Sequence, residues 1–410
     1  MDGARTRGHP GALDAVAAML RRGSPGAVLL VGPAGIGKTT LALDLAAGLL
    51  CTASEPAARP DGTCRACRLV QHGTHPDVHR LGPEGPGRQV VIGGPGKPRG
   101  IRDLVAELAL LPVEGGARVA IVESADRMNE DAQAALLKTL EEPPADTTIV
   151  LCADVEEPIL PTIRSRCARI RLGPVGTRDI ESILADADLA DAPDAARIAR
   201  IAAGRPGLAL AWARRPDALR ERDALGRALL DLTSARPADR LSGIRAVAAG
   251  AAALIGIGES TDGAQTASAG PAGAGRGRRL KAGDPGTVPA GRPAADDPAP
   301  DADDTAEDEA STPARTPATE RRKAAEAVLA LWTDVTRDLA LCQRGLAGSV
   351  RDLARLEETQ ALAAVLDPGE VATFLDRLGE ATVRLATNVS PELLLDDLAL
   401  AWPARRRRAA

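Results

Sequence analysis

Aromatic side chains are nearly absent from this sequence. Its 410 residues include no tyrosine, one phenylalanine and three tryptophans. Any hydrophobic core must therefore be built mainly from aliphatic side chains, which bury enough apolar surface to hold a fold together. A chain of this length has room for two or three domains.

Long apolar runs and an excess of positive charge are missing as well. No stretch of about 18 apolar residues occurs, so we expect no membrane span, and the opening "MDGARTRGHP" lacks the apolar segment of a signal peptide. The net charge of −5 gives no overall attraction for polyanions, so nucleic-acid contact would need a local patch or a partner. Six cysteines without an export signal favour metal binding over disulfides. We expect a cytoplasmic protein.

Short apolar runs alternate with helical patterns in the first part of the chain. The candidate strands are residues 27–31, 117–122 and 147–152, with a fourth at 168–172. Strands that alternate with helices predict a parallel α/β sheet. Residues 176–216 have the pattern of several short helices.

The second half is helical on both sides of an unusual segment. Residues 217–254 are alanine-rich and helical in pattern, and amphipathic helices return from about 322 to 402. Between them, residues 255–320 are rich in Gly, Pro, Ala and Asp and have almost no large apolar side chains. Such a composition cannot offset the entropy of ordering, so it predicts a disordered insert.

The segment "GPAGIGKTT" fits the phosphate-loop pattern GxxxxGK[ST] completely. It follows a predicted strand and opens a predicted helix, as this motif requires. Its glycines let backbone N–H groups face phosphate oxygens, while the lysine reaches the β- and γ-phosphates and the following threonine ligates Mg²⁺. The alternative is a loop that keeps this shape and stays empty. The candidate nucleotide-binding residues are Gly32, Gly35, Gly37, Lys38, Thr39, Thr40 and Glu123.

The hydrolytic half of such a site is incomplete. The strand "ARVAIV" ends in Glu123, the candidate Mg²⁺ carboxylate, and then Ser124, which cannot act as a general base at neutral pH. Asp126 follows one helical turn later. These residues predict nucleotide binding with little or no hydrolysis by the chain alone.

Several segments resemble bacterial clamp-loader subunits of the AAA+ class, the tau/gamma and delta-prime subunits of DNA polymerase III. The similarity lies in "AALLKTLEEPP", in "PTIRSRC" after it, in "GTHPDV" and in the tail "NVSPELLLDDLAL". Together these segments extend the resemblance over about residues 1–220 and 322–402. The family's tau/gamma members carry Asp-Glu where this chain has Glu123-Ser124, and in this respect the chain is more similar to delta-prime.

The resemblance implies a fold and its divisions. It implies an α/β AAA+ P-loop domain with a parallel sheet, then a small helical lid and an all-α C-terminal collar domain interrupted by a disordered insert. The implied divisions are the AAA+ domain at 1–173 with a zinc-module-like insert at 51–67, the lid at 174–218, the collar at 219–254 plus 322–402, and the disordered insert at 255–321.

The resemblance also implies a role for Arg166, the arginine of "SRC". In this family that arginine extends to ATP held by the neighbouring subunit, and a planar, always-charged guanidinium suits this contact. The alternative is an ordinary surface or salt-bridge arginine. Arg205, in "GRPGLAL", is a weaker candidate for contact with phosphate, because Gly and Pro there also mark a helix boundary.

Related subunits carry a four-cysteine zinc module after the phosphate-loop helix. Here the matching positions are Cys51, Asp61, Cys64 and Cys67, so a carboxylate would replace one thiolate in a structural Zn²⁺ site. His72 or His75 is an alternative fourth ligand, and free thiols on a degenerate loop are the alternative to a metal site.

Two functions remain open from the sequence. The first is a non-hydrolysing or weakly hydrolysing delta-prime subunit that binds ATP with Mg²⁺ and has as partners the tau/gamma and delta subunits, the sliding clamp and, through the assembled ring, primer–template DNA. The second is a self-sufficient ATPase of the tau/gamma type, with Glu123 and Asp126 as its working carboxylates.

Overall fold

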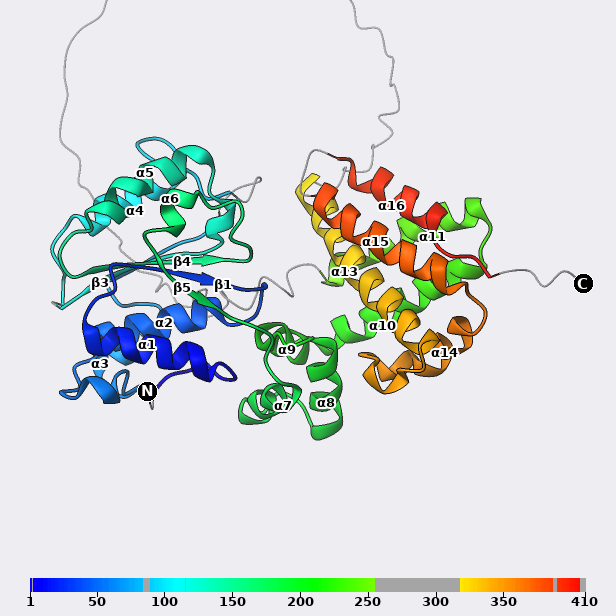
Figure 1. The fold of residues 1–410 in the computed structure, drawn as a ribbon, viewed down its shortest axis with the longest axis horizontal. Helices are drawn as coiled ribbons and strands as arrows, with labels where there is room; N and C mark the ends of the chain where they lie inside the picture. The colour runs from blue at the N-terminus through cyan, green and yellow to red at the C-terminus, as the bar shows by residue number, and fades with distance from the viewer. Residues whose placement is uncertain (2, 84–88, 115, 255–317, 386–388, 406–410) are drawn as a thin grey trace, which may run out of the picture. The chain divides into compact units, whose positions relative to one another are not determined.

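A computed structural model describes residues 1, 3–83, 89–114, 116–254, 318–385 and 389–405 (Figure 1). Most of the insert predicted at 255–321 lies outside the described residues. Its last four residues, 318–321, form the first turn of helix α13 (Ala318–Gln343). They were wrongly placed in the insert because "ATER" consists largely of good helix formers beside a Pro-rich segment. Within the described residues, no helix is both long and apolar enough to cross a membrane.

Five parallel strands form the sheet, in the order β2-β3-β4-β1-β5. Their bounds are β1 (Ala27–Val31), β2 (Val78–Leu81), β3 (Arg118–Val122), β4 (Thr147–Ala153) and β5 (Ala168–Arg171). The four strands expected from the sequence are present, and the α/β prediction is confirmed. The fifth, β2, is the short edge strand "VHRL", whose polar residues gave no apolar run to detect.

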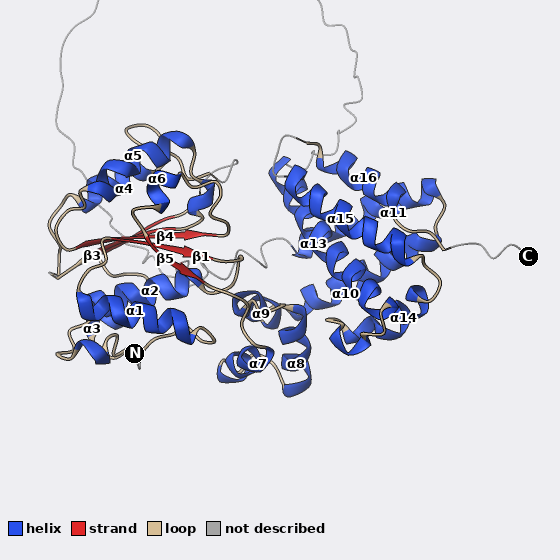
Figure 2. Cartoon of the chain, in the orientation of Figure 1, coloured by secondary structure: helices blue, strands red, loops and turns tan. Residues whose placement is uncertain are grey.

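Helices cover both faces of the sheet (Figures 1 and 2). On one face, alternate strand residues such as Val28 and Leu30 pack against α1 (Pro10–Arg22), α2 (Lys38–Leu50) and α3 (Arg65–Gln71). On the other face, their neighbours Ala27 and Leu29 pack against α4 (Ile101–Leu108), α5 (Glu130–Glu141) and α6 (Pro161–Arg164). Because side chains alternate along a strand, both faces of β1 are apolar and its sequence is a continuous apolar run.

Helices make up the rest of the described chain. Three short helices share a core that contains Trp212, namely α7 (Thr177–Asp186), α8 (Ala192–Ile201) and α9 (Pro206–Ala213). A larger helical core follows, built from α10 (Pro216–Asp231), α11 (Pro237–Gly250), α13, α14 (Leu356–Ala363), α15 (Pro368–Leu385) and α16 (Pro391–Ala401).

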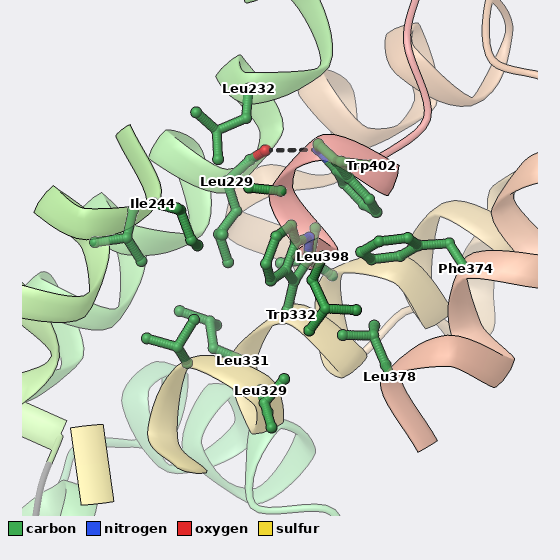
Figure 3. Close-up of a cluster of buried hydrophobic side chains, with 14 of the residues drawn as sticks. Leu229, Leu232, Ile244, Leu329, Leu331, Trp332, Phe374, Leu378, Leu398 and Trp402 are labelled. Carbon is green, nitrogen blue, oxygen red and sulfur yellow. Dashed lines mark hydrogen bonds between the residues drawn. The ribbon is translucent and has the colours of Figure 1, made fainter. Parts of the chain in front are cut away.

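Three of the four aromatic residues of the chain meet in this larger core (Figure 3). The ring centroids of Phe374 and Trp402 are 4.6 Å apart, and those of Phe374 and Trp332 are 5.2 Å apart. The Trp402 indole also donates to the carbonyl of Leu229 on α10, at 3.0 Å. Helices from before and after residues 255–317 therefore share one hydrophobic core.

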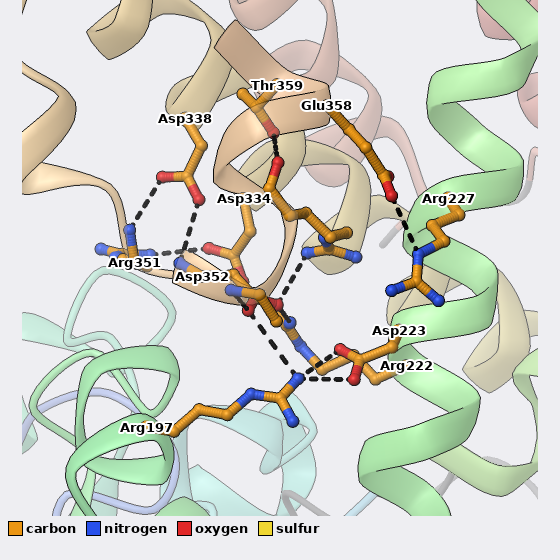
Figure 4. A network of polar contacts seen from close by, with 12 residues as sticks. Arg197, Arg222, Asp223, Arg227, Asp334, Asp338, Arg351, Asp352, Glu358 and Thr359 are labelled. Atoms are coloured by element: carbon orange, nitrogen blue, oxygen red, sulfur yellow. Dashed lines mark hydrogen bonds and ion pairs between the residues drawn. The ribbon is translucent and has the colours of Figure 1, made fainter. Parts of the chain in front are cut away.

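A buried ionic network lies beside α10 (Figure 4). The side chain of Asp352 is 2% exposed. Its Oδ2 forms ion pairs with Nη1 of Arg222 at 2.8 Å and with Nη2 of Arg355 at 3.0 Å. Burial by itself raises the pKa of Asp352, but the adjacent arginines, Arg355 foremost, lower it below its ordinary value. The same network contains Arg197 of α8, which pairs with Asp223 of α10.

Candidate nucleotide-binding site

The phosphate loop connects the end of β1 to the start of α2. A side chain at Gly32 would lie 2.6 Å from the carbonyl oxygen of Leu172, so only glycine fits beside the segment that follows β5. Gly37 has φ 108°, in the region that favours glycine, and it precedes the first residue of α2 without a side-chain cap. The loop therefore directs an open helix N-terminus toward the site, an arrangement that favours anions.

Lys38 lies within this loop and is 5% exposed. Its ammonium donates to the carbonyl oxygens of Gly32 at 2.7 Å and Pro33 at 3.1 Å. It also forms an ion pair with Asp154, whose Oδ1 lies 2.7 Å from Nζ. An ammonium has three N–H donors, so these contacts match its whole capacity.

Glu123 lies at the end of β3, where the sequence predicts the Mg²⁺ carboxylate. Its Oε1 accepts from Arg80 of β2 at 2.8 Å from Nε and 2.5 Å from Nη2. Ser124 follows with φ 52°, a left-handed conformation uncommon for a residue other than glycine. The predicted metal carboxylate is thus already held by a guanidinium on the neighbouring strand.

Asp126 faces the end of β4. Its Oδ1 accepts from the backbone N–H of Asp154 at 3.1 Å. Burial is the main cause that raises the pKa of Asp126, and the charge of Asp154 adds to it. Asp126 is therefore linked to the phosphate-loop lysine through Asp154, although it comes late in the motif.

A cavity of about 210 Å³ adjoins the phosphate loop. Its walls come from the loop and α2, from the N-terminal segment, from α3 and from α7 and α9. They include Arg7, His9, Gly35, Gly37, Thr39, Ile183, Pro206, Leu210 and Arg214. A volume of this kind, with an anion-favouring helix end and apolar walls, suits a phosphorylated ligand with a flat apolar part.

The N-terminal segment is fixed in place by α2. The buried Asp44 carboxylate accepts from the backbone N–H of Arg5 at 2.9 Å and from the N–H and hydroxyl of Thr6 at 2.8 and 2.6 Å. Burial raises the pKa of Asp44, while these hydrogen bonds counteract part of the increase. His9 contacts the carbonyl of Ile36 at 3.0 Å, so one cavity wall is anchored to the loop itself.

The start of α9 contacts the loop directly. The backbone N–H of Gly207 donates to the carbonyl of Gly35 at 2.9 Å. Arg205 instead donates from Nε to the carbonyl of Ala202, at 3.2 Å, and burial lowers its pKa. Arg205 does not line the cavity, whereas its neighbours Pro206 and Gly207 do.

Arg166 lies on the surface, directly after α6. Its side chain is 36% exposed and donates to Glu141 at 2.6 Å and to the carbonyl of Thr162 at 2.9 Å. Glu141 is 51% exposed and belongs to the "LEEPP" segment at the end of α5. Two of the four segments that carry the family resemblance thus meet in one exposed ion pair.

The four predicted metal ligands come together after α2. The ligand atoms of Cys51, Asp61, Cys64 and Cys67 all lie within 4.8 Å of one another. The sulfurs of Cys51 and Cys64 are 3.9 Å apart, close to the edge of about 3.8 Å expected for a tetrahedron with Zn–S bonds of about 2.3 Å. Backbone N–H groups of Cys64 and Thr63 lower the pKa of Asp61 to about 2, which keeps it ionised as a ligand must be. The donor set and its spacing fit a structural zinc ion.

The two histidines considered as alternative ligands lie elsewhere. His75 is buried, and its Nδ1 accepts from the backbone N–H of Asp77 at 3.2 Å. His72 is exposed and lines the cavity beside the phosphate loop. Within the described residues, neither joins the cysteine cluster.

Sequence reasoning missed three residues that shape this site, namely Asp154, Arg80 and Asp44. Asp154 directly follows β4 and lies two residues beyond the predicted strand at 147–152. Carboxyl ends of parallel strands line ligand sites, so this position carried a usable signal. Arg80 lies on the strand that was not predicted. Asp44 had no local signal, because its partners precede it by 38 and 39 residues.

Comparison with known proteins gives a consistent result. Residues 9–176 match the sequence profile of a family described as DNA polymerase III, delta subunit. DNA polymerase III subunit delta′ of Pseudomonas aeruginosa is 43% identical over 143 residues, 35% of this chain and 42% of that protein. The Escherichia coli K12 delta′ subunit is 38% identical over 187 residues, 45% of this chain and 53% of that protein.

A tau subunit is also similar. DNA polymerase III subunit tau of Escherichia coli K12 is 31% identical over 183 residues, 43% of this chain and 27% of that protein. The matches to the delta′ proteins span about half of their length. The matched residues contain the phosphate loop, the Glu123-Ser124 pair and Arg166. Residues 9–176 of the chain are therefore similar in sequence to DNA polymerase III delta/delta′ subunits.

Proposed function

We propose that this chain is the delta′ subunit of a DNA polymerase III clamp loader and works in the cytoplasm as a stator. In this role it hydrolyses little or no ATP, and it supplies Arg166 to ATP bound by the neighbouring subunit. Its partners are tau/gamma and delta subunits, and through the assembled ring the sliding clamp and primer–template DNA.

The observation that carries this proposal is a contrast between two parts of one chain. The lysine and the carboxylate of its own site are each held by an internal partner, Asp154 for Lys38 and Arg80 for Glu123. Ser124 supplies no carboxylate to orient water. Arg166, in contrast, pairs with the exposed carboxylate of Glu141 and donates to the carbonyl of Thr162, and exposed ion pairs are worth about 0–1 kcal/mol. Its guanidinium can leave Glu141 for a phosphate at little cost.

Two cofactors belong to this proposal. Mg²⁺–ATP would be held by the phosphate loop through backbone N–H groups, Lys38 and Thr39, as in other P-loop proteins. A structural zinc ion would be held by Cys51, Asp61, Cys64 and Cys67 and would connect the segment after α2 to the first turn of α3. Its contribution would be to stability and not to catalysis.

A self-sufficient ATPase of the tau/gamma type is the second candidate. The complete phosphate loop favours it, as does the carboxylate of Asp126, which accepts from the backbone N–H of the Lys38 partner Asp154. It predicts steady ATP turnover by the isolated chain, which the stator proposal does not.

The deciding experiment measures DNA- and clamp-stimulated ATP turnover by a ring reconstituted with tau/gamma and delta subunits. The native chain is compared with Arg166→Ala and with Arg169→Ala, a matched control whose side chain is 52% exposed on the adjacent strand. We expect Arg166→Ala to lower turnover by about tenfold or more, since arginine fingers contribute about 10³–10⁵ in other NTPases. Arg169→Ala should leave it unchanged.

Two results would contradict the proposal. One is equal turnover in rings that contain native chain or Arg166→Ala, after gel filtration has shown that both rings assemble. The other is turnover by the isolated chain comparable to that of the ring, with loss of turnover in Lys38→Ala. The second result would establish the ATPase alternative.

A further inference from the structure

The end of β4 places a carboxylate against the lysine of the phosphate loop. Asp154 Oδ1 is 2.7 Å from Lys38 Nζ, with the lysine 5% and the aspartate 38% exposed. This contact occupies the third donor of the ammonium, because the other two point to the carbonyls of Gly32 and Pro33.

Backbone contacts fix Asp154 in this position. The N–H of Gly32 donates to the carbonyl of Ala153 at 3.1 Å, which ties the first residue of the loop to the last residue of β4. The N–H of Asp154 itself donates to Asp126 at 3.1 Å. Backbone hydrogen bonds at Ala153 and at Asp154 therefore hold the aspartate beside the lysine.

The γ-phosphate of a nucleoside triphosphate would compete with Asp154 for the position beside Lys38 Nζ. In a phosphate loop the lysine contacts the β- and γ-phosphates. A γ-phosphate oxygen at hydrogen-bond distance from Nζ would lie within about 5 Å of the Asp154 carboxylate, since each is about 2.7–2.9 Å from the same nitrogen. Two like charges at that separation repel, and the lysine cannot neutralise both fully. A diphosphate lacks the γ-phosphate and meets less of this repulsion.

We propose that Asp154 sets the nucleotide specificity of this site, so that the phosphate loop accepts ADP in preference to ATP. The carboxylate of Asp154 pairs with the ammonium of Lys38, where a γ-phosphate would otherwise bind. This inference rests on the proposed nucleotide site, but it is independent of the role of Arg166. A phosphate loop that prefers ADP has no need of a carboxylate at position 124 to orient water, which accounts for the combination of a complete loop with Ser124.

The test is direct titration of the full chain with ADP and with ATP, each with Mg²⁺, followed by calorimetry. The variants are Asp154→Asn, which removes the charge and keeps the shape, and Asp154→Ala. Glu157→Gln is the matched control, because Glu157 is exposed on the same segment and its change alters the net charge equally. Lys38→Ala identifies the heat that comes from the phosphate loop. Circular dichroism and thermal melting show that each variant is folded.

We expect the native chain to bind ADP more tightly than ATP. Asp154→Asn and Asp154→Ala should raise the affinity for ATP by about tenfold or more and change the affinity for ADP by less than about threefold. Glu157→Gln should behave as the native chain.

Three outcomes would overturn the inference. Equal gains for ADP and ATP would show a general charge effect and no γ-phosphate discrimination. Weaker ATP binding in Asp154→Asn would show that Asp154 helps to hold Mg²⁺ or phosphate. Absence of binding in both the native chain and Asp154→Asn would show an empty loop, which rejects this inference and the nucleotide part of the proposed function, while the Arg166 experiment in the ring remains decisive for the stator role.

Discussion

Phe374→Ala should destabilise the large helical core more than any other single truncation on α15. Phe374 is the only phenylalanine of the chain, is 1% exposed and packs between Trp332 and Trp402. Truncation of a buried Phe to Ala costs about 3–5 kcal/mol. Aromatic pairs are worth about 0.5–1.5 kcal/mol beyond buried area, which places Phe374 at the upper end of this range, so we expect a loss of about 4–5 kcal/mol.

The assay is urea unfolding followed by tryptophan fluorescence. Trp332 and Trp402 report on this core, whereas the third tryptophan, Trp212, lies in the core of α7 to α9. All variants therefore carry Trp212→Phe, because a chain with several cores does not unfold in a single two-state step and the signal must report on one of them.

Val383→Ala is the matched control on the same helix. Its side chain is 71% exposed, so its truncation should change the free energy of unfolding by no more than about 0.5 kcal/mol. A loss below about 1 kcal/mol for Phe374→Ala, or equal losses for both variants, would refute the reasoning that the three rings hold this core together.

Three further predictions concern other parts of the chain. Gly226→Ala should lower stability by about 1–3 kcal/mol in the same assay, because its Cβ would overlap the guanidinium of Arg355. Asp352→Asn should cost about 3–5 kcal/mol at pH 7, since it removes the negative charge that faces the buried guanidinium groups of Arg355 and Arg222. The folded-state pKa of Asp352 is lowered, so its contribution is complete above its ordinary value of 3.8 and is lost as the pH falls below it; the difference between variant and native chain should shrink in acid. Cys64→Ser should lower the zinc content measured by mass spectrometry from one ion per chain toward none and lower the melting temperature. A chain purified without zinc, or unchanged melting in Cys64→Ser, would reject the metal site.

The sequence predicted those features that depend on local pattern. Continuous apolar runs marked β1, β3 and β4, because each is buried on both faces of the sheet. The spacing of Cys64 and Cys67 and the resemblance at Asp61 predicted a cluster whose ligand atoms do converge. The phosphate loop was found because its pattern requires glycine at fixed positions.

Features that depend on neighbouring strands were not predicted. The contact between Lys38 and Asp154 joins residues 116 positions apart, and it exists because β1 and β4 are adjacent in the sheet. The pair of Arg80 and Glu123 depends in the same way on β2 lying beside β3. A motif shows which residue types are present, but strand order decides which of them meet.

Three ion pairs in the proposed sites differ in solvent exposure. The free-energy cost of breaking each pair should rise as its exposure falls. Arg166 and Glu141 are 36% and 51% exposed, so water replaces the lost contact readily. Arg80 and Glu123 are 23% and 21% exposed, and Lys38 is only 5% exposed. Release of a largely buried charge from its partner costs more, because little water can replace that partner. Arg166 is thus the charge most easily transferred to a ligand of another subunit, while Lys38 and Glu123 stay bound within the chain unless a ligand supplies an equally close charge. This order favours a subunit that acts on its neighbour's nucleotide over one that acts on its own.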